Sequence, residues 1–224
     1  MKKNIAIILA RKGSKGIKNK NLIKVNGKPL IYWSIKTCKM SKKIDSVWVS
    51  SDSNKILNVS KKFGANTIKR PTKYSLDKST SDSAWFHAVK YLNKKNFFSD
   101  LIVGLQPTSP IRSSKSLDLA IEKFKKRNLD SLFSAQRISN HFIWKNTLRG
   151  LKANYNYSKR PMRQDIEEKY LENGSFYIFN SKKFLKKKCR LFGKIGVFIM
   201  NKVQSLEIDD KEDLHLIRAL KKFF

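Results

Sequence analysis

A basic, glycine-containing loop near the start of the chain has the clearest potential for chemistry. It follows an uninterrupted apolar run at residues 5–10, which predicts a buried parallel strand ending at the loop. Glycines let backbone N–H groups turn toward one point, and cations beside them favour a bound triphosphate. The loop lacks the Walker and dinucleotide spacings, so a flexible basic turn after an ordinary strand is the alternative. The residues concerned are Arg11, Lys12, Gly13, Lys15, Gly16 and Lys20.

Two carboxylates near the C-terminal end suit a hard divalent cation. Residues 206–209 are predicted as a short strand, whose side-chain period of two places Glu207 and Asp209 on one side. Mg²⁺ typically binds one or two carboxylates together with substrate phosphates and water. The alternative is that Asp209 or Asp210 caps the last helix. Both hold if Asp210 is the cap and Asp209 the metal ligand.

A rigid polar segment follows a second apolar run, at residues 101–105. Its two prolines fix the backbone, and the Gln106 amide can donate to and accept from a ligand such as a base edge. An ordinary rigid turn is the alternative. Further along, Arg160 and Arg163 carry guanidiniums of the kind that clamp carboxylate or phosphate in a bidentate manner, unless they are plain surface arginines.

These residues lie on a regular alternation of apolar runs and amphipathic segments. Such alternation with short links predicts an α/β fold with a doubly wound, mostly parallel sheet, whose ligands bind at the carboxyl ends of its strands. A chain of 224 residues fits one domain, 1–224. Predicted strands are 5–10, 45–50, 65–68, 101–105, 131–135, 174–179 and 195–200, and predicted helices are 29–38, 54–63, 81–92, 116–126 and 210–220.

The alternation breaks at residues 137–172, which are polar and aromatic without a helical period. A long irregular segment in a compact domain is usually functional or disordered, and its aromatic content argues against disorder. We therefore predict an irregular arm that packs against another surface.

A net charge of +32 invites assignment as a basic nucleic-acid-binding protein, a rival from a different class. However, 39 of the 49 basic residues are lysines scattered along the chain, and no signature of a nucleic-acid-binding module is present. We expect weak, nonspecific polyanion binding and no specific nucleic acid partner. The absence of a long apolar run and of a signal peptide predicts a cytoplasmic chain without membrane attachment.

Four motifs occur in order along nearly the whole chain: residues 8–21, 105–112, 173–178 and 208–209. Together they make the chain resemble the acylneuraminate cytidylyltransferases, also called CMP-sialic acid or CMP-nonulosonic acid synthetases. The resemblance implies a Rossmann-like nucleotidyltransferase fold. It also implies a reaction in which CTP and a nonulosonic acid give the CMP-sugar and pyrophosphate, with Mg²⁺ as cofactor.

The resemblance also implies roles for single residues. Arg11, Lys20 and Asp209 would be catalytic, and the nucleotide would be bound by Arg11, Gly13, Ser14, Lys20, Asn21, Arg70, Ser79 and Ser81. On the sugar side it implies Gln106, Arg163 and Asn173. The metal ligand would be Asp209, joined by Glu207, which stands where many relatives have Asp.

Two further expectations come from the same resemblance. The arm at residues 137–172 matches a dimerisation segment that reaches into the neighbouring subunit's site, which implies a homodimer and places Arg163 there. Relatives specific for N-acetylneuraminic acid often carry Arg at the position of Leu171, so a legionaminic-type or other bacterial sugar acid is expected. The alternative substrate is another acidic sugar such as 3-deoxy-octulosonate.

Overall fold

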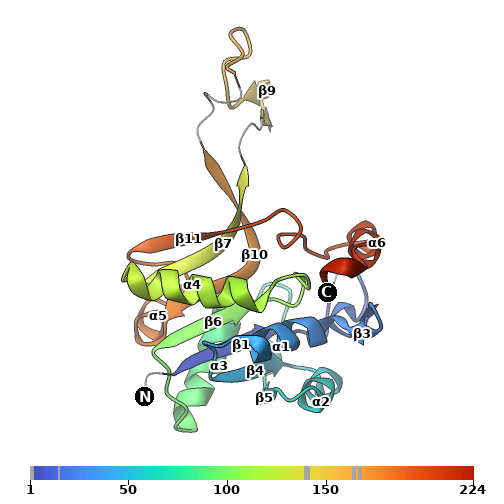
Figure 1. The fold of residues 1–224 in the computed structure, drawn as a ribbon, viewed down its shortest axis with the longest axis vertical. Helices are drawn as coiled ribbons and strands as arrows, with labels where there is room; N and C mark the ends of the chain where they lie inside the picture. The colour runs from blue at the N-terminus through green and yellow to red at the C-terminus, as the bar shows by residue number, and fades with distance from the viewer. Residues whose placement is uncertain (1–2, 15, 139–141, 163–164, 166–167) are drawn as a thin grey trace.

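The computed structural model describes residues 3–14, 16–138, 142–162, 165 and 168–224. Within these residues a seven-stranded sheet with strand order β11-β7-β10-β6-β1-β4-β5 forms the centre of the molecule (Figure 1). Its strand pairs are parallel except for the two that β10 makes with β6 and β7. The prediction of a doubly wound, mostly parallel α/β sheet is confirmed.

The strands of this sheet are β1 (Asn4–Leu9), β4 (Ser46–Ser51), β5 (Asn66–Lys69), β6 (Leu101–Leu105), β7 (Ser131–Ile138), β10 (Lys169–Asn180) and β11 (Ile195–Met200). The helices are α1 (Leu30–Met40), α2 (Asn54–Lys62), α3 (Ser81–Lys94), α4 (Ser114–Lys126), α5 (Ser181–Lys187) and α6 (Lys211–Ala219). Short 3₁₀ turns lie at Lys20–Leu22, Thr72–Tyr74 and Lys221–Phe223. In the described part of the chain, no helix is long and apolar enough to cross a membrane.

Helices cover both faces of the sheet. Successive side chains of β1 point to opposite faces, so the strand contributes to the core on each side. Ala6 and Ile8 pack into a core with apolar side chains of α1, α2 and α4, whereas Ile5 and Ile7 pack with those of α3 and α5. These β1 side chains are fully buried. This double burial explains the unbroken apolar run in the sequence.

Parallel pairing in register brings several loops to one edge of the sheet. Leu9 at the end of β1 pairs with Ser50 of β4, and Ile8 pairs with Leu105 at the end of β6. The segments that follow β1, β4 and β6 therefore start side by side, as do the residues after β5, where the Arg70 N–H donates to the Ser51 carbonyl. Ligands of doubly wound sheets bind at such an edge.

Polar side chains set the starts of the helices at this edge. Ser53 caps α2 by accepting from the Ile56 N–H. The cap of α3 is Thr80, whose hydroxyl accepts from the Ser83 N–H. Asp210 caps α6 and forms a reciprocal capping box with Asp213, which confirms Asp210 as the cap of the last helix.

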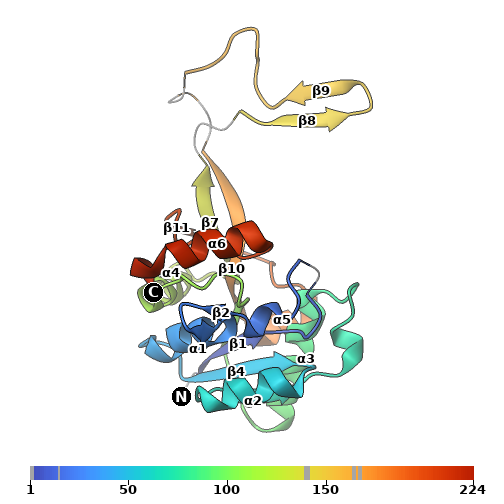
Figure 2. The same ribbon diagram turned by 90° about the vertical axis from the view of Figure 1, so that its right-hand side faces the viewer.

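Two predictions about local structure are wrong. Residues 206–209 form a loop in place of a short strand, and the Ile208 N–H donates to the Thr108 carbonyl of the segment after β6. The segment 137–172 is more regular than predicted: β7 and β10 extend into it as an antiparallel ribbon that carries a hairpin, β8 (Trp144–Thr147) and β9 (Gly150–Ala153). Figure 2 shows this hairpin standing far from the body of the molecule.

A second hairpin, β2 (Lys24–Val25) and β3 (Lys28–Pro29), follows the basic loop. Its turn residues Asn26 and Gly27 both have positive φ, as the Asn-Gly pair predicts. Val25 and Leu30 pack with apolar side chains of α6 and with Ile208. This third core holds the C-terminal segment beside the basic loop.

Candidate functional site

Two cavities open side by side at the carboxyl ends of the strands. One, of about 400 Å³, is lined by residues of the basic loop, by the segment after β6 and by Asp209. The other, of about 270 Å³, is lined by Arg70, the loop at residues 74–80 and the start of α3. Leu9, Arg11 and Gln106 line both cavities, so the two form one continuous site.

The larger cavity is bounded by contacts between the basic loop and the C-terminal segment. Lys20 Nζ donates to the Ile208 carbonyl at 2.7 Å and to Asp209 Oδ1 at 3.0 Å. Gly16 lies so close to the Asp209 carbonyl that a Cβ at Gly16 would overlap this oxygen. Ser14 and Asn21 complete the loop's share of the lining. Glycine is required at this position because the two backbones approach too closely for a side chain.

Arg11 stands on the wall between the cavities. One of its terminal nitrogens lies 3.0 Å from Asp77 Oδ1. Its backbone carbonyl accepts a hydrogen bond of 2.9 Å from Asn21 Nδ2, and Asn21 is buried. Asn21 thus fixes the start of the basic loop, while the Arg11 side chain faces the site.

The smaller cavity contains a buried cation. Arg70 is only 4% exposed, and its Nε has no hydrogen-bond partner. Burial lowers the pKa of Arg70 to about 10, an effect that Asp52 opposes and Arg11 adds to. Arg70 therefore stays charged at neutral pH. Ser79 and Ser81 line the same cavity, as the resemblance implies for a nucleoside.

The segment after β6 is held from behind by a fully enclosed guanidinium. Arg112 donates to the carbonyls of Gln106 at 2.9 Å, Ser109 at 3.0 Å and Ser175 at 2.6 Å. Burial lowers the pKa of Arg112 to about 10, so it remains a cation. These bonds fix the turn that presents the Gln106 side chain to both cavities.

The predicted metal carboxylates lie in different environments. Asp209 is mostly exposed, whereas Glu207 is largely buried, with Oε1 lacking a hydrogen-bond partner. Burial and then the charge of Asp209 raise the pKa of Glu207 to about 7, while Arg112 and Lys20 oppose this shift. An orphaned carboxylate oxygen electrostatically coupled to an exposed carboxylate fits a divalent cation that also binds phosphate. Among the described residues, no group of three or more acidic, histidine or cysteine side chains could hold a metal by itself.

Among the described residues, the predicted site residues that line neither cavity are Gly13, Asn173 and Glu207. Gly13 is exposed. Asn173 is buried, and its side chain bonds to Ser134 Oγ and Ser205 Oγ, which makes it part of the scaffold behind the site. Arg163 lies outside the described residues.

Two residues of the site carried no assigned role in the sequence. Asp77 is the single acid among residues 72–81, and a lone acid in a basic chain is the signal that could have marked it. Arg112 directly follows the apolar Ile111 and precedes the Ser113 cap of α4. The sequence gives no signal of its burial, because arginine is rarely fully buried unless it is paired.

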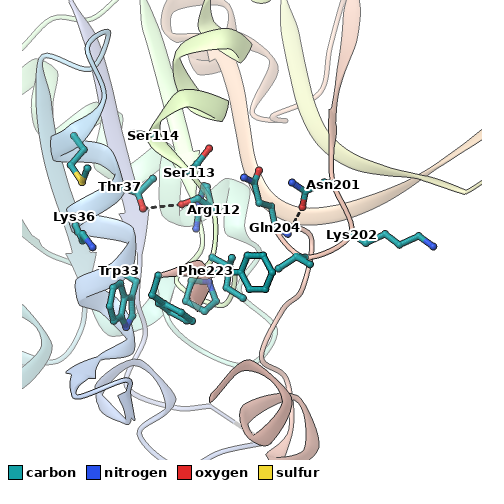
Figure 3. A pocket seen from close by; sticks show the side chains of 15 residues that line it. Trp33, Lys36, Thr37, Arg112, Ser113, Ser114, Asn201, Lys202, Gln204 and Phe223 are labelled. Atoms are coloured by element: carbon teal, nitrogen blue, oxygen red, sulfur yellow. Dashed lines mark hydrogen bonds between the residues drawn. The ribbon is translucent and has the colours of Figure 1, made fainter. Parts of the chain in front are cut away.

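A third cavity, of about 580 Å³, lies away from this site. Figure 3 shows it between α1 and the C-terminal segment, with Trp33 and Phe223 in its wall and the Thr37 hydroxyl donating to the Arg112 carbonyl. It shares no lining residue with the other two cavities. Its aromatic lining contrasts with the strand-end site, where Arg11, Arg70 and Lys20 are gathered.

The strand-end site suits an elongated ligand with a polar ring at one end and a polyanion at the other. The smaller cavity offers hydroxyls and a buried guanidinium, and the larger one offers Lys20 and the basic loop. Fixed cations at a strand end neutralise phosphate charge. The two cavities together therefore match the shape and charge of a nucleotide.

Comparisons with known proteins show the family of this chain. Residues 5–223 match the family model described as cytidylyltransferase. N-acylneuraminate cytidylyltransferase A of Danio rerio is 37% identical over 209 residues, which cover 91% of this chain and 47% of that protein. The chain thus spans about half the length of that vertebrate relative. Pseudaminic acid cytidylyltransferase of Campylobacter jejuni is 31% identical over 226 residues, covering 98% of this chain and 97% of the relative.

The fold agrees with a solved structure of CMP:2-keto-3-deoxy-manno-octonic acid synthetase in complex with CTP. The TM-score is 0.72 at 17% identity, and the match covers 98% of each chain. At this identity the likeness concerns the fold alone. The family match over residues 5–223 and the sequence relatives carry the assignment: the chain belongs to the cytidylyltransferase family.

Proposed function

We propose that this protein couples CTP to a nonulosonic acid, giving the CMP-sugar and pyrophosphate. The observation that carries the proposal is the joining of Lys20 to Asp209 across the larger cavity, next to Arg11 and Gln106. A nucleotide triphosphate needs the cations, and a sugar acid needs an amide or cationic partner. The names of the relatives, N-acylneuraminate and pseudaminic acid cytidylyltransferases, support this substrate class.

The two cavities give the nucleotide an orientation. The cytosine and ribose would occupy the smaller cavity beside Arg70, Ser79 and Ser81. The triphosphate would then pass Arg11 into the larger cavity, toward Ser14 and Lys20. Gln106 borders both cavities, so the acid bound there would lie next to the α-phosphate.

The reaction is a nucleotidyl transfer. The anomeric hydroxyl oxygen of the sugar acid attacks the α-phosphorus and loses its proton, while the bond to the β-phosphate oxygen breaks and pyrophosphate leaves. Such a transfer depends mainly on positioning and on neutralising charge. Lys20 and Arg11 would supply fixed positive charge, and Gln106 would orient the acid.

Asp209 and Glu207 would hold the metal. Cytidylyltransferases generally use a divalent metal, and Mg²⁺ matches a site of two carboxylates completed by substrate phosphates. When bound, the cation supplies further positive charge to the phosphates and lowers the pKa of a hydroxyl that it contacts. The Glu207 carboxylate must lose its proton to bind the metal, which its pKa of about 7 permits at neutral pH.

The arm at residues 137–172 would join two subunits. Leu148 and Leu151 of its hairpin are exposed, and they belong to none of the apolar cores formed by the described residues. Exposed apolar side chains of this kind mark a protein interface. A homodimer would cover them, and Arg163 of the same arm would reach the sugar acid in the partner's site.

A pyrophosphate-release assay tests the function. The protein should release pyrophosphate with CTP and a nonulosonic acid, and much less with ATP, GTP or UTP. The acids to compare are neuraminic, legionaminic and pseudaminic acids, with 3-deoxy-octulosonate as the competing substrate. Release with 3-deoxy-octulosonate alone would replace the proposed sugar class, and no release with any of them would refute the proposal.

A further inference from the structure

A polar cluster next to Gln106 belongs to neither cavity. It consists of Asp82, Glu172, Tyr177 and Arg190, here called the Arg190 cluster. Arg190 lies 3.4 Å from Asp82 and 3.9 Å from Glu172, and its guanidinium stacks 4.4 Å from the centre of the Tyr177 ring. The Tyr177 hydroxyl donates to Glu172. Three segments distant in sequence thus meet around one cation.

The sheet register places this cluster beside the predicted sugar side of the site. Tyr177 of β10 pairs with Gly104 of β6, two residues before Gln106. Alternation along β6 puts Gly104 and Gln106 on the same face, the face covered by α3. Two residues of a strand span roughly 7 Å. A sugar acid held at Gln106 would therefore extend toward Tyr177 and Arg190.

The packing around Gly104 gives the cluster a rigid base. The Trp85 ring lies against Gly104 so closely that a Cβ there would meet the ring. Trp85 also contacts the Tyr177 ring at a centroid distance of 5.6 Å, and Arg190 lies over both rings. The Arg190 backbone N–H donates to Asp82 at 3.1 Å, which anchors the arginine to α3. A preorganised guanidinium loses little entropy on binding a ligand.

The cluster has unused hydrogen-bonding capacity. Arg190 Nε is buried and has no hydrogen-bond partner among the described residues, and the Glu172 side chain is 41% exposed. Two carboxylates and one guanidinium give the cluster a formal charge of −1, opposite in sign to the +32 of the chain. Such a group suits a neutral substituent that both donates and accepts, such as an acylamino group, and disfavours a second carboxylate.

We propose that the Arg190 cluster is a specificity subsite for an acylamino substituent of the sugar acid, remote from its anomeric carbon. Arg190 donates to the acyl carbonyl, and Glu172 accepts from the amide N–H. This inference rests on the proposed function, because it assigns a further part of the same acceptor site. It distinguishes acylamino sugar acids from hydroxyl-bearing ones such as 3-deoxy-octulosonate.

The test compares the wild type with Arg190→Met, which keeps an apolar stem on Tyr177 and removes the guanidinium. Glu172→Gln removes the carboxylate charge at similar volume. We expect Arg190→Met to raise KM for a di-acylamino nonulosonic acid about tenfold or more, with KM for CTP unchanged. Glu172→Gln should reduce the preference for that acid over 3-deoxy-octulosonate. The matched control is Arg127→Met, which changes an exposed arginine at the end of α4.

The outcomes separate the two proposals. Lack of pyrophosphate release by the wild type with every acid would overturn the proposed function, and this assignment with it. If the wild type is active, an unchanged KM and acid preference in Arg190→Met would overturn the subsite alone. Equal rises in KM for CTP and for the acid, together with a lowered melting temperature, would mean a purely structural role and would also overturn it.

Discussion

Lys20 and Asp209 are 189 residues apart in the sequence, and their side chains form an ion pair of 3.0 Å. The same Lys20 ammonium donates to the backbone carbonyl of Ile208. The basic loop after β1 and the turn before α6 are thus one structural unit, although nothing in local sequence links them. This contact brings together a cation suited to phosphate and a carboxylate suited to a metal.

Lys20→Ala and Asp209→Ala should each lower kcat/KM for CTP about a hundredfold or more, because each removes a charge that acts on the phosphates. The melting temperature of Asp209→Ala should change little, because the Asp209 side chain is 72% exposed and exposed ion pairs contribute little stability. That of Lys20→Ala should fall further, because the Lys20 side chain is only 13% exposed and also donates to the Ile208 carbonyl. Pyrophosphate release and thermal unfolding check both points. Lys24→Ala, at an exposed lysine of β2, is the control. Release at the wild-type rate by either variant would contradict the assignment.

Gly16→Ala should impair the same unit sterically. The added methyl group would overlap the Asp209 carbonyl, so the loop or the turn must shift, and overpacking of this kind costs about 1–3 kcal/mol. We expect kcat/KM to fall about tenfold. In Gly13→Ala the methyl group meets open space, so the loss should be much smaller. Equal effects of the two substitutions would show that close packing at Gly16 is unimportant.

The sequence predicted the sheet well because each buried strand carries its own signal. The apolar run in β1 and the short links between elements are sufficient to indicate parallel strands covered on both faces. The prediction of a strand at residues 206–209 was wrong because the alternation of apolar and acidic residues there is also typical of a strand. Leu206 and Ile208 in fact belong to the small core around α6. The hairpin of the arm has mostly exposed side chains on both strands, so no alternation with burial marks it.

The lining of the cavities was predictable where a motif directly follows a buried strand, as for Arg11, Lys20 and Gln106. It was less predictable where burial changes a residue's task. Asn173 belongs to a recognisable motif, yet its amide is used to hold Ser134 and Ser205 inside the fold. The pairing of Arg11 with Asp77 depends on two loops meeting at the sheet edge, which no local pattern encodes.

Asp77→Asn should tighten CTP binding. In the free protein Asp77 pairs with Arg11, and a triphosphate would compete with this carboxylate for the guanidinium. An exposed pair is worth at most about 1 kcal/mol, so KM for CTP should fall about two- to fivefold. Steady-state kinetics at low ionic strength would measure the change, and added salt should diminish it. A rise in KM would mean that Asp77 contacts the nucleotide favourably.

Glu207 should make the stability of the metal-free protein depend on pH. Its pKa is raised from 4.5 to about 7 by folding, so the folded state binds the extra proton between these values. The free energy of unfolding therefore falls as pH rises from about 4.5 to 7. In Glu207→Gln the side chain stays neutral at every pH. Its free energy of unfolding should therefore fall by up to about 3 kcal/mol less than that of the wild type over this pH range.

Urea unfolding at several pH values in the presence of a chelator measures this difference. Glu212→Gln, at an exposed glutamate in the first turn of α6, is the matched control. Adding Mg²⁺ above pH 7 should stabilise the wild type more than Glu207→Gln, because a metal requires the deprotonated carboxylate. Parallel pH profiles for the wild type and Glu207→Gln would contradict the raised pKa.

Leu148→Asp and Leu151→Asp in the arm should convert a homodimer into monomers. Leu148 lies in the turn between β8 and β9 and is fully exposed in the single chain, and Leu151 of β9 is 69% exposed. Burial of one leucine contributes about 1.5–3 kcal/mol to the free energy of association. In a two-fold symmetric dimer each leucine is buried once in each subunit, so the contribution is doubled. Sedimentation velocity should show the loss of the dimer, and pyrophosphate release should fall if the arm completes the partner's site. Leu119→Asp, on the exposed side of α4, should leave the dimer intact, and a monomeric but fully active wild type would refute the role of the arm.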